Sequence, residues 1–187
     1  MRITGGRARG IPLTAPKGEG TRPATDQLRE AVFSSLGPRI ESARVADLFA
    51  GTGAYGLEAM SRGASSGLFV ENSREAVACL KKNLAAVSKS CGTKPGDWRV
   101  LAQKIYTIPE NLGPFDIVFM DPPYAMIEER IPEIFAEHIA GILADQGLVC
   151  FEMPGNLDLE LFGWQPIRRL GKSGKDKPTA VFYQKTP

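Results

Sequence analysis

Residues 47–56 read DLFAGTGAYG and contain a complete G-x-G-x-x-G pattern, from Gly51 to Gly56. Glu71 follows Gly51 by 20 residues. In nucleotide-binding α/β folds this pattern marks a tight glycine turn between a strand and a helix, and the later acidic residue holds a ribose. The stretch therefore predicts a strand, a glycine turn, a helix and a nucleotide-like ligand between them. A glycine turn of purely structural purpose is the alternative.

Strand-like and helix-like segments alternate after residue 44. Short apolar runs predict five strands, at residues 44–49, 67–71, 98–102, 115–120 and 148–153. Apolar residues at helical spacing predict helices at residues 54–61, 74–87 and 127–143. Residues 164–170 and 179–185 predict a closing antiparallel pair of strands. This alternation is typical of a Rossmann-like α/β fold with a doubly wound, mostly parallel sheet.

The first 24 residues differ from the rest in being rich in Gly, Pro, Arg and Thr. Residues 1–6 and 9–16 predict two short strands joined by a glycine turn. Residues 25–36, TDQLREAVFSSL, have apolar residues at helical spacing, and a Gly-Pro pair ends that helix. We therefore expect a basic β-hairpin extension at residues 1–24 and one main domain at residues 25–187.

The composition argues against several classes of protein. A chain of 187 residues with 43% apolar residues is typical of one globular domain, and no apolar run approaches the roughly 20 residues that span a bilayer. MRITGGRARG lacks the apolar core of a signal peptide. Three cysteines without C-x-x-C spacing and a single histidine, His138, favour neither a disulfide nor a metal site. We expect a cytoplasmic protein without a metal ion.

The net charge of +2 conceals an uneven distribution. Residues 1–44 carry eight Lys or Arg and four Asp or Glu, residues 45–164 carry nine and sixteen, and residues 165–187 carry six and one. Both ends are therefore basic and the middle is acidic. Basic segments attract phosphates whatever the nucleotide sequence, so the ends predict a nucleic-acid partner. Solvated basic tails without a partner are the alternative.

Asp47 decides between two ligands that the glycine loop would accept equally well. NAD carries an anionic pyrophosphate, which favours a bare helix N-terminus. A carboxylate four residues before Gly51 would repel that group. S-adenosylmethionine (SAM) carries an ammonium and a sulfonium, which a carboxylate attracts. The loop with its leading Asp therefore favours SAM as the cofactor.

The motif Asp121-Pro122-Pro123-Tyr124 directly follows the apolar run FDIVFM. The two prolines restrict the backbone and lack amide donors, which leaves the Pro122 carbonyl and the Asp121 carboxylate as acceptors. Tyr124 offers a ring on which a base can stack. Two acceptors beside a ring suit the exocyclic amine of a flat base. The lone pair of such an amine is normally delocalised into the base, and hydrogen bonds that draw the N–H groups out of plane localise it on the nitrogen for attack. A simple turn is the alternative.

The chain resembles SAM-dependent amino-group N-methyltransferases in three features that a parallel sheet brings to one crevice. These are DLFAGTGAYG, an acidic residue at the end of the second strand, and DPPY. More narrowly, it resembles the bacterial small-subunit (16S) ribosomal RNA guanine-N2 methyltransferase family, through MRITGGRARGIPL, TRPATDQLREAVFSSL, GLEAMSRGA and FVEN. The resemblance implies a class I SAM-dependent methyltransferase fold and methyl transfer to the exocyclic N2 amine of a guanine in 16S rRNA.

The resemblance also implies roles for individual residues. It implies SAM contacts, with Glu71 on the ribose hydroxyls, at Asp47, Phe49, Gly51, Gly53, Glu71, Asn72 and Gln103. It implies catalytic contacts with a flipped guanine at Asp121, Pro122 and Tyr124. It implies RNA contacts at Arg2, Arg7, Arg9, Arg22, Thr25, Arg29 and Pro123. In two places the chain departs from the family pattern: Gln103 stands where an acid usually meets the adenine amine, and KSGKDKP fits poorly.

The implied reaction is an in-line transfer of methyl from a sulfonium to an amine, and its neutral thioether leaving group needs no metal ion. We expect a monomer that acts on 16S rRNA within a small ribosomal subunit or an assembly intermediate. Three alternatives remain. DPPY also permits a DNA adenine-N6 methyltransferase. A protein-amide methyltransferase usually carries Asn before Pro-Pro-Tyr. The third is an inactive RNA-binding module, against which the intact DPPY argues.

Overall fold

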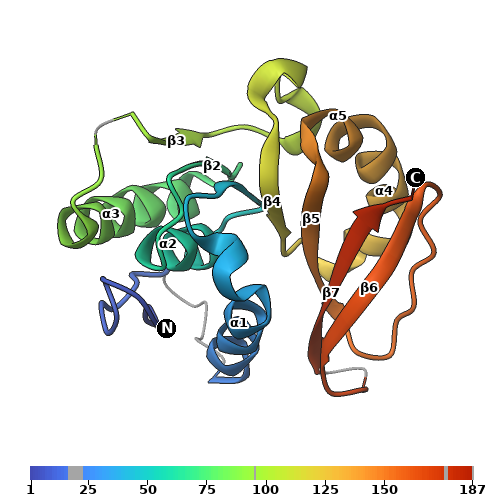
Figure 1. Cartoon of the computed structure of the whole chain (residues 1–187), viewed down its shortest axis with the longest axis horizontal. Helices are drawn as coiled ribbons and strands as arrows, with labels where there is room; N and C mark the ends of the chain where they lie inside the picture. The colour runs from blue at the N-terminus through green and yellow to red at the C-terminus, as the bar shows by residue number, and fades with distance from the viewer. Residues whose placement is uncertain (17–22, 95, 175–176, 187) are drawn as a thin grey trace.

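The computed structural model describes residues 1–16, 23–94, 96–174 and 177–186. Its centre is one seven-stranded sheet with the strand order β3-β2-β1-β4-β5-β7-β6 (Figure 1). The strands are β1 (Arg44–Leu48), β2 (Ser66–Val70), β3 (Trp98–Leu101), β4 (Phe115–Met120), β5 (Leu143–Pro154), β6 (Trp164–Gly171) and β7 (Pro178–Lys185). β1 to β5 are parallel, and β7 runs antiparallel to both β5 and β6. The predicted doubly wound sheet and its closing antiparallel pair are confirmed.

The helices follow the strands in the expected alternation. The longer ones are α1 (Pro23–Leu36), α2 (Ala54–Ser61), α3 (Arg74–Cys91) and α4 (Ile127–Ile134). A π-helical stretch, η5 (Phe135–Ile139), joins α4 to the short α5 (Ala140–Ile142). Short 3-10 turns are η1 (Gly37–Ile40), η2 (Ile105–Thr107), η3 (Glu110–Leu112) and η4 (Tyr124–Met126). No helix among the described residues is both long and apolar enough to cross a membrane.

The sheet is covered on both faces, which gives the protein two apolar cores. One core combines the sheet with α1, α2 and α3, and the other combines it with α4, η5 and α5. Alternate residues of β4 enter the two cores: Ile117 and Phe119 enter the first, and Val118 and Met120 enter the second. Each such side chain contributes about 1.5–3 kcal/mol by its burial. The continuous apolar run FDIVFM is therefore the signature of a strand buried on both faces.

The N-terminal segment pairs with itself as a short hairpin, although residues 1–16 form no regular strand. Ile3 N donates to Ile11 O at 3.0 Å and Leu13 N to Met1 O at 3.1 Å, on either side of an antiparallel bridge between Arg2 and Pro12. The turn between the two arms pairs with α2: Thr4 N and Gly5 N donate to the Glu58 carboxylate, and Arg7 N donates to Ser61 O at 2.7 Å. The segment also places apolar residues in the first core, namely Ile3, Ala8 and Leu13. A separate extension domain at residues 1–24 stays a prediction.

The predicted helix at residues 127–143 is interrupted. It consists of α4, η5 and α5, and Pro132 lies inside α4, where its missing amide N–H removes a helical hydrogen bond. β5 begins at Leu143, five residues earlier than predicted, because Leu143 pairs with Phe115 before a register shift in the β4–β5 ladder. Neither difference moves the carboxyl end of β5, where the strand faces the crevice described next.

Candidate active site

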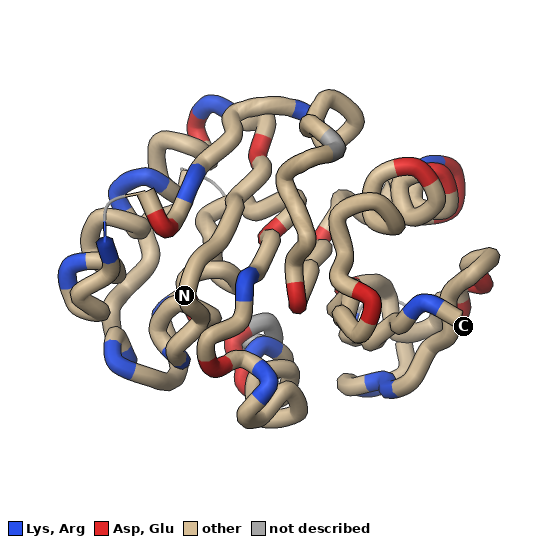
Figure 2. Tube along the Cα trace, turned by 45° about the horizontal axis from the view of Figure 1, so that its top comes forward, with Lys and Arg blue, Asp and Glu red and all other residues tan. Residues whose placement is uncertain are grey.

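A crevice forms where the carboxyl ends of β2, β1, β4 and β5 meet. The strand order places β2 on one side of β1 and β4 on the other, and ligands of doubly wound sheets bind at this switch point. Four carboxylates belong to this edge: Asp47 near the end of β1, Glu71 after β2, Asp121 after β4 and Glu152 near the end of β5. Figure 2 shows acidic positions in the middle of the molecule, with basic positions mostly toward its outside.

The glycine loop turns sharply between β1 and α2. Phe49 and Gly51 have positive φ angles of 62° and 54°, and Gly53, the N-cap of α2, has a φ of 83°. A Cβ on Gly53 would lie 2.3 Å from Leu80 Cδ1, whereas a Cβ on Gly51 would meet no atom within 4 Å. Gly53 is therefore needed for packing against α3, and Gly51 is the glycine whose surroundings are open to a ligand.

The third glycine of the pattern, Gly56, also serves packing. A Cβ there would lie 2.3 Å from Phe69 Cε1 on β2. Its backbone N–H donates to Asp47 Oδ2 at 2.8 Å, so the first turn of α2 rests on both β1 and β2. The G-x-G-x-x-G pattern thus combines one open glycine with two that let α2 approach its neighbours.

Glu71 holds the glycine loop against the end of β2. Its Oε2 accepts from Gly51 N at 2.8 Å, and its Oε1 accepts from Asn72 N at 2.8 Å and Ser73 N at 2.7 Å. Beside it lies a small cavity of about 80 Å³. Five predicted site residues share the lining of this cavity: Phe49, Glu71, Asn72, Gln103 and Pro123. Gln103 Nε2 donates to Thr107 O at 2.9 Å, which fixes the plane of its amide.

Asp47 lies beneath the loop, with 3% of its surface exposed. Burial raises its pKa to about 8, and the nearby charge of Glu71 acts in the same direction. The Gly56 N–H and the Arg29 guanidinium favour the carboxylate but do not outweigh burial. A cation held above the loop would favour the ionised form, so Asp47 is poised to respond to a positively charged ligand.

The DPPY motif forms the opposite wall of the crevice. Pro122 is buried, whereas Asp121, Pro123 and Tyr124 are exposed. The dense protein around Asp121 raises its pKa well above the ordinary value, and the carboxylates of Glu152 and Asp47 add to this effect. Tyr124 is the first residue of η4, directly after the two prolines. The structure therefore brings the glycine loop, Glu71 and DPPY to one edge of the sheet, as the sequence predicts.

Two residues of the crevice are not among the predicted site residues. Glu152 is 5% exposed, and its Oε2 accepts a hydrogen bond from Tyr55 Oη at 2.7 Å. Tyr55 is the fifth residue of GTGAYG, and its ring stacks on Phe119 with the centroids 5.2 Å apart. The sequence does contain a signal for Glu152: it is the one charged residue in the apolar run LVCFEM, at a position that the strand pattern predicts to be buried.

The prediction that Arg29 contacts RNA is wrong for a physical reason. Arg29 is 1% exposed, and its guanidinium donates to Arg2 O at 2.6 Å, Asp26 Oδ1 at 3.0 Å and Glu58 Oε2 at 3.4 Å. These partners occupy its donors inside the protein, so it supports the N-terminal segment instead of meeting a phosphate. The sequence showed an arginine on a helix but not which face of the helix it occupies.

A protein-family model described as "Conserved hypothetical protein 95" matches residues 1–180. The chain belongs to this family. Over 155 residues it is 39% identical to ribosomal RNA small subunit methyltransferase D of Escherichia coli (strain K12), with 81% of this chain and 74% of that protein covered. A protein of the same name from Haemophilus influenzae is 36% identical over 127 residues, with 66% of this chain and 64% of that protein covered.

Solved structures of similar sequence have the same fold over nearly the whole chain. The Escherichia coli methyltransferase yhhF superposes with a TM-score of 0.80 at 32% identity, covering 99% of this chain and 97% of that chain. A Haemophilus influenzae methylase superposes with a TM-score of 0.76 at 27% identity, covering 100% and 99%. The resemblance to a methyltransferase family and the expected methyltransferase fold are confirmed.

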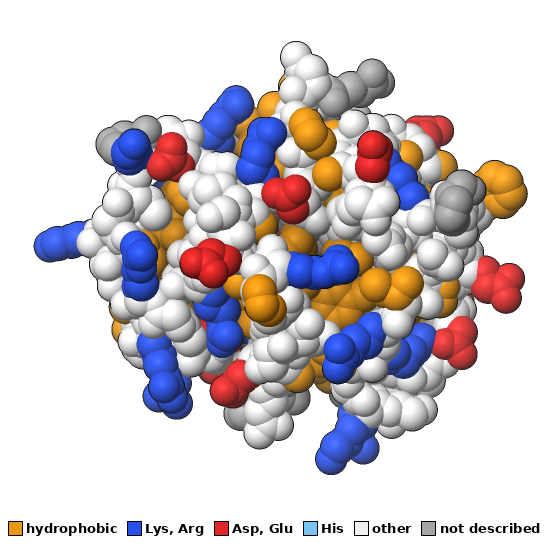
Figure 3. Space-filling view, in the orientation of Figure 1, with side chains coloured by type: hydrophobic (Ala, Val, Ile, Leu, Met, Phe, Trp, Pro, Cys, Tyr) orange, Lys and Arg blue, Asp and Glu red, His pale blue; other side chains and the backbone are white. Residues whose placement is uncertain are grey.

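Of the remaining predicted RNA contacts, Pro123 lines the cavity beside Glu71, and the others belong to the N-terminal part of the chain. Arg2, Arg7 and Arg9 are exposed, Thr25 lies in the first turn of α1, and Arg22 lies outside the described residues. Arg7 is held at the far ends of α2 and α3, where its backbone N–H bonds Ser61 O. That position is about 12 Å along α2 from the glycine loop. On the face seen in Figure 3, basic side chains stand out beside α2 and α3 and again over β6 and β7.

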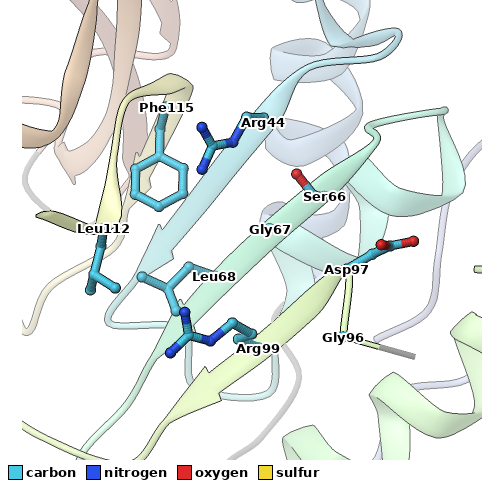
Figure 4. Close-up of a pocket in the computed structure, with 9 residues that line it drawn as sticks. All are labelled: Arg44, Ser66, Gly67, Leu68, Gly96, Asp97, Arg99, Leu112 and Phe115. Atoms are coloured by element: carbon cyan, nitrogen blue, oxygen red, sulfur yellow. The ribbon is translucent and has the colours of Figure 1, made fainter. Parts of the chain in front are cut away.

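A different cavity, of about 250 Å³, lies at the opposite end of the strands (Figure 4). Arg44 and Ser66, which begin β1 and β2, line it together with Arg99 and Phe115. The Arg44 guanidinium lies over the Phe115 ring, 5.7 Å from its centroid. No predicted site residue lines this cavity, and ligands of such sheets bind at the carboxyl ends of the strands. We therefore assign the reaction to the other edge.

Proposed function

We propose that the protein transfers a methyl group from SAM to the exocyclic N2 amine of a guanine in the 16S rRNA of the small ribosomal subunit. The observation that carries this proposal is that Asp47, Glu71 and the DPPY motif, which begins with Asp121, lie together at one crevice. The chain in which they meet is 39% identical to a protein named ribosomal RNA small subunit methyltransferase D. Such a substrate agrees with the cytoplasmic location expected from the sequence.

The residues of the crevice fit SAM better than a dinucleotide. Several carboxylates gather there and would repel an anionic pyrophosphate, whereas a bound cation would favour the ionised form of the buried Asp47 carboxylate. Glu71 and Asn72 would hold the ribose, and Phe49 and Gln103 would border the adenine in the cavity that they line. Asp47, Gly51 and Gly53 would border the cationic methionine end. When bound, SAM supplies a methyl group on a positively charged sulfur.

The DPPY wall positions and activates the amine. The Asp121 carboxylate and the Pro122 carbonyl accept hydrogen bonds from the two N–H groups of guanine N2, which leaves the nitrogen lone pair facing the methyl carbon. Tyr124, exposed at the start of η4, stacks on the base, and Pro123 borders it. Stacking of this kind contributes about 1–3 kcal/mol. After transfer the secondary ammonium on N2 loses one proton, which Asp121 or water accepts.

The exposed N-terminal arginines supply affinity for RNA. Arg2, Arg7 and Arg9 are exposed on the segment that docks on α2, and Arg22 belongs to the same side of the chain in sequence. They would contact phosphates, which fixes the position of the RNA without reading its bases. The target guanine must leave its stack to reach DPPY, at a cost of a few kcal/mol that is smaller in a single-stranded loop. Recognition would then depend on RNA shape within a small subunit or an assembly intermediate, by a monomer.

Transfer of labelled methyl groups tests this function. Purified protein and labelled SAM are incubated with free 16S rRNA, assembled small subunits or duplex DNA, and the products are digested to nucleosides. We expect label in N2-methylguanosine from an RNA substrate. Label in N6-methyl-2′-deoxyadenosine from the DNA would support the DNA alternative, for which the named relatives give no support. Absence of label from all three substrates would contradict methyl transfer to nucleic acid.

A further inference from the structure

The carboxylates of Asp47, Asp121 and Glu152 belong to one face of the sheet. Asp47 shares its face of β1 with Val45, and Glu152 shares its face of β5 with Cys150; both neighbours belong to the core beneath α1, α2 and α3. The β4–β5 ladder pairs Met120 with Phe151, so Asp121 and Glu152 are the next residues of two adjacent parallel strands. Neighbouring strands are about 4.8 Å apart, which brings these two carboxylates close together.

Glu152 is held from the side of α2. Tyr55 Oη donates to Glu152 Oε2 at 2.7 Å. Tyr55 is itself buried, with its ring stacked on Phe119 of β4 and tilted against Phe33 of α1. A phenol in this position cannot leave without breaking the aromatic cluster. Burial raises the pKa of Glu152 above its ordinary value. The hydrogen bond from Tyr55 opposes this effect, because a carboxylate is a stronger acceptor than a carboxylic acid.

We propose that Tyr55 and Glu152 form an electrostatic support for Asp121. Tyr55 favours the ionised form of Glu152 against the opposing effect of burial, and the negative charge of Glu152 strengthens the hold of Asp121 on the proton that leaves the methylated amine. This inference rests on the proposed function for its use in the reaction. Glu152 acts through Asp121, so it is a positioning residue; the proton passes from the ammonium nitrogen to the Asp121 carboxylate, and no proton moves to Glu152.

The other charged and titratable groups around the pair agree with this division of roles. Asp47 on β1 adds a like charge to Asp121, and Arg29 on α1 favours ionised Glu152. The Cys150 thiol, two residues before Glu152, is buried, and burial raises its pKa well above the ordinary value, so it stays neutral. The dense protein around Asp121 and the neighbouring carboxylates raise the pKa of Asp121 well above its ordinary value, in the direction that a proton acceptor needs.

The direct test is the titration of Asp121 by carboxyl-carbon NMR in protein labelled at its aspartate side chains, with the signal assigned by Asp121→Asn. Glu152→Gln keeps the shape of the side chain and removes its charge. We expect it to lower the midpoint of the Asp121 titration by about one pH unit or more, the coupling at which two acids titrate as a pair. Tyr55→Phe should shift the midpoint in the same direction by less, because it weakens the ionised form of Glu152 without removing the carboxyl group.

Tyr183→Phe is the matched control. Tyr183 is also a buried tyrosine whose hydroxyl donates to one acceptor, Leu159 O at 3.0 Å, but it belongs to the core on the other face of the sheet. It should leave the midpoint unchanged. An unmoved midpoint in folded Glu152→Gln protein would overturn the inference, as would an equal shift in Tyr183→Phe.

The pH dependence of kcat/KM for methyl transfer connects this titration to the reaction. In Glu152→Gln, the acidic limb of the pH profile of kcat/KM should move to lower pH, because this limb follows the protonation of Asp121. If Glu152 had only a structural role, the variant would lower kcat/KM at every pH and leave the acidic limb in place. If the wild-type protein transfers no methyl group, the proposed function fails, and the NMR titration still decides whether Glu152 controls Asp121. If the wild type is active and the Asp121 midpoint does not move, the inference alone fails.

Discussion

Asp121 carries a prediction about the chemical step. It lies directly after β4, next to the two prolines, whereas the glycine loop and Glu71 lie on the other side of the crevice. Asp121→Ala should therefore lower kcat for methyl transfer by at least about 100-fold, the usual contribution of a positioned acid or base. SAM affinity, measured by calorimetry, should stay within a few-fold.

Asp116→Ala is the control for this variant. Asp116 is an exposed aspartate at the opposite end of the same strand, where it accepts from Arg44 N at 2.8 Å. It should keep full activity. Full activity in Asp121→Ala would remove the argument that this carboxylate activates the amine, and a large loss of SAM affinity would assign it to the cofactor instead.

Asp47 carries a prediction about stability and pH. Burial raises its pKa from the ordinary value of 3.8 to about 8. The folded state therefore holds this proton more tightly than the unfolded chain, so the stability that the group contributes is present below about pH 4 and is lost as the pH rises toward about 8. Asp47→Asn should remove this loss, by up to about 1.4 kcal/mol for each pH unit in that window.

Urea unfolding between about pH 5 and about pH 8 measures this effect. Asn keeps an acceptor for the Gly56 N–H, which should allow the variant to fold. The free energy of unfolding of the wild type should decline relative to Asp47→Asn as the pH rises. Asp116→Asn, at an exposed position, should follow the wild type, and parallel curves for the wild type and Asp47→Asn would contradict the assignment.

At the scale of elements, Glu58 of α2 is a main anchor of the N-terminal segment. Glu58 is fully buried and accepts from Thr4 N at 2.8 Å, Gly5 N at 2.8 Å and Arg62 Nε at 2.8 Å, with Arg29 Nε at 3.4 Å. Glu58→Ala leaves the buried Arg29 short of a partner. We expect a loss of about 3 kcal/mol in the free energy of unfolding, as for other broken buried ion pairs.

Glu75→Ala is the control at this scale. Glu75 is exposed in the first turn of α3, where its charge interacts favourably with the helix dipole. Its removal should cost about 0.3–1 kcal/mol. A loss in Glu58→Ala no larger than this, measured in the same urea titrations, would show that the N-terminal segment is anchored by other contacts.

At the scale of the whole molecule, charge is separated between an acidic crevice and basic outer surfaces. RNA affinity should therefore fall steeply with salt, because each phosphate contact releases bound counterions. Arg7→Gln and Arg9→Gln should each reduce the slope of log affinity against log salt by about 0.7–0.9. Filter binding or fluorescence titration of the rRNA substrate at several salt concentrations measures this slope.

Arg99→Gln is the matched control for the arginines. Arg99 is exposed and lines the cavity at the opposite end of the strands, on the face of the sheet away from the N-terminal segment. It should leave the slope unchanged. An equal decrease in all three variants would mean that RNA binding follows net charge rather than the N-terminal side, and a flat response of the wild type to salt would make the basic ends irrelevant to binding.

The sequence predicted most of the fold because each segment carries its own pattern. FDIVFM is apolar on both faces, and REAVACLKKNLAAV is apolar on one helical face, so their structures follow from periods of two and about 3.6 residues. The docking of the N-terminal segment on α2 was not predicted. Its backbone donors pair with Glu58, which is 54 residues away from Thr4, and no local pattern reports such a partner.

By itself, the sequence determined the order of strands and helices, the glycine turn, and the residues that follow β2 and β4, because local periodicity and turn chemistry depend on near neighbours. Only the tertiary structure decided which side chains are buried together. Arg29 pairs with Glu58 inside the protein instead of contacting RNA. Gly53 and Gly56 allow α2 to pack closely against its neighbours. Tyr55 forms a hydrogen bond with Glu152, which is 97 residues away in the sequence. Burial and the electrostatics of the crevice depend on groups that meet only when the sheet assembles. Because these groups are far apart in the sequence, no short stretch of it specifies the distances between them.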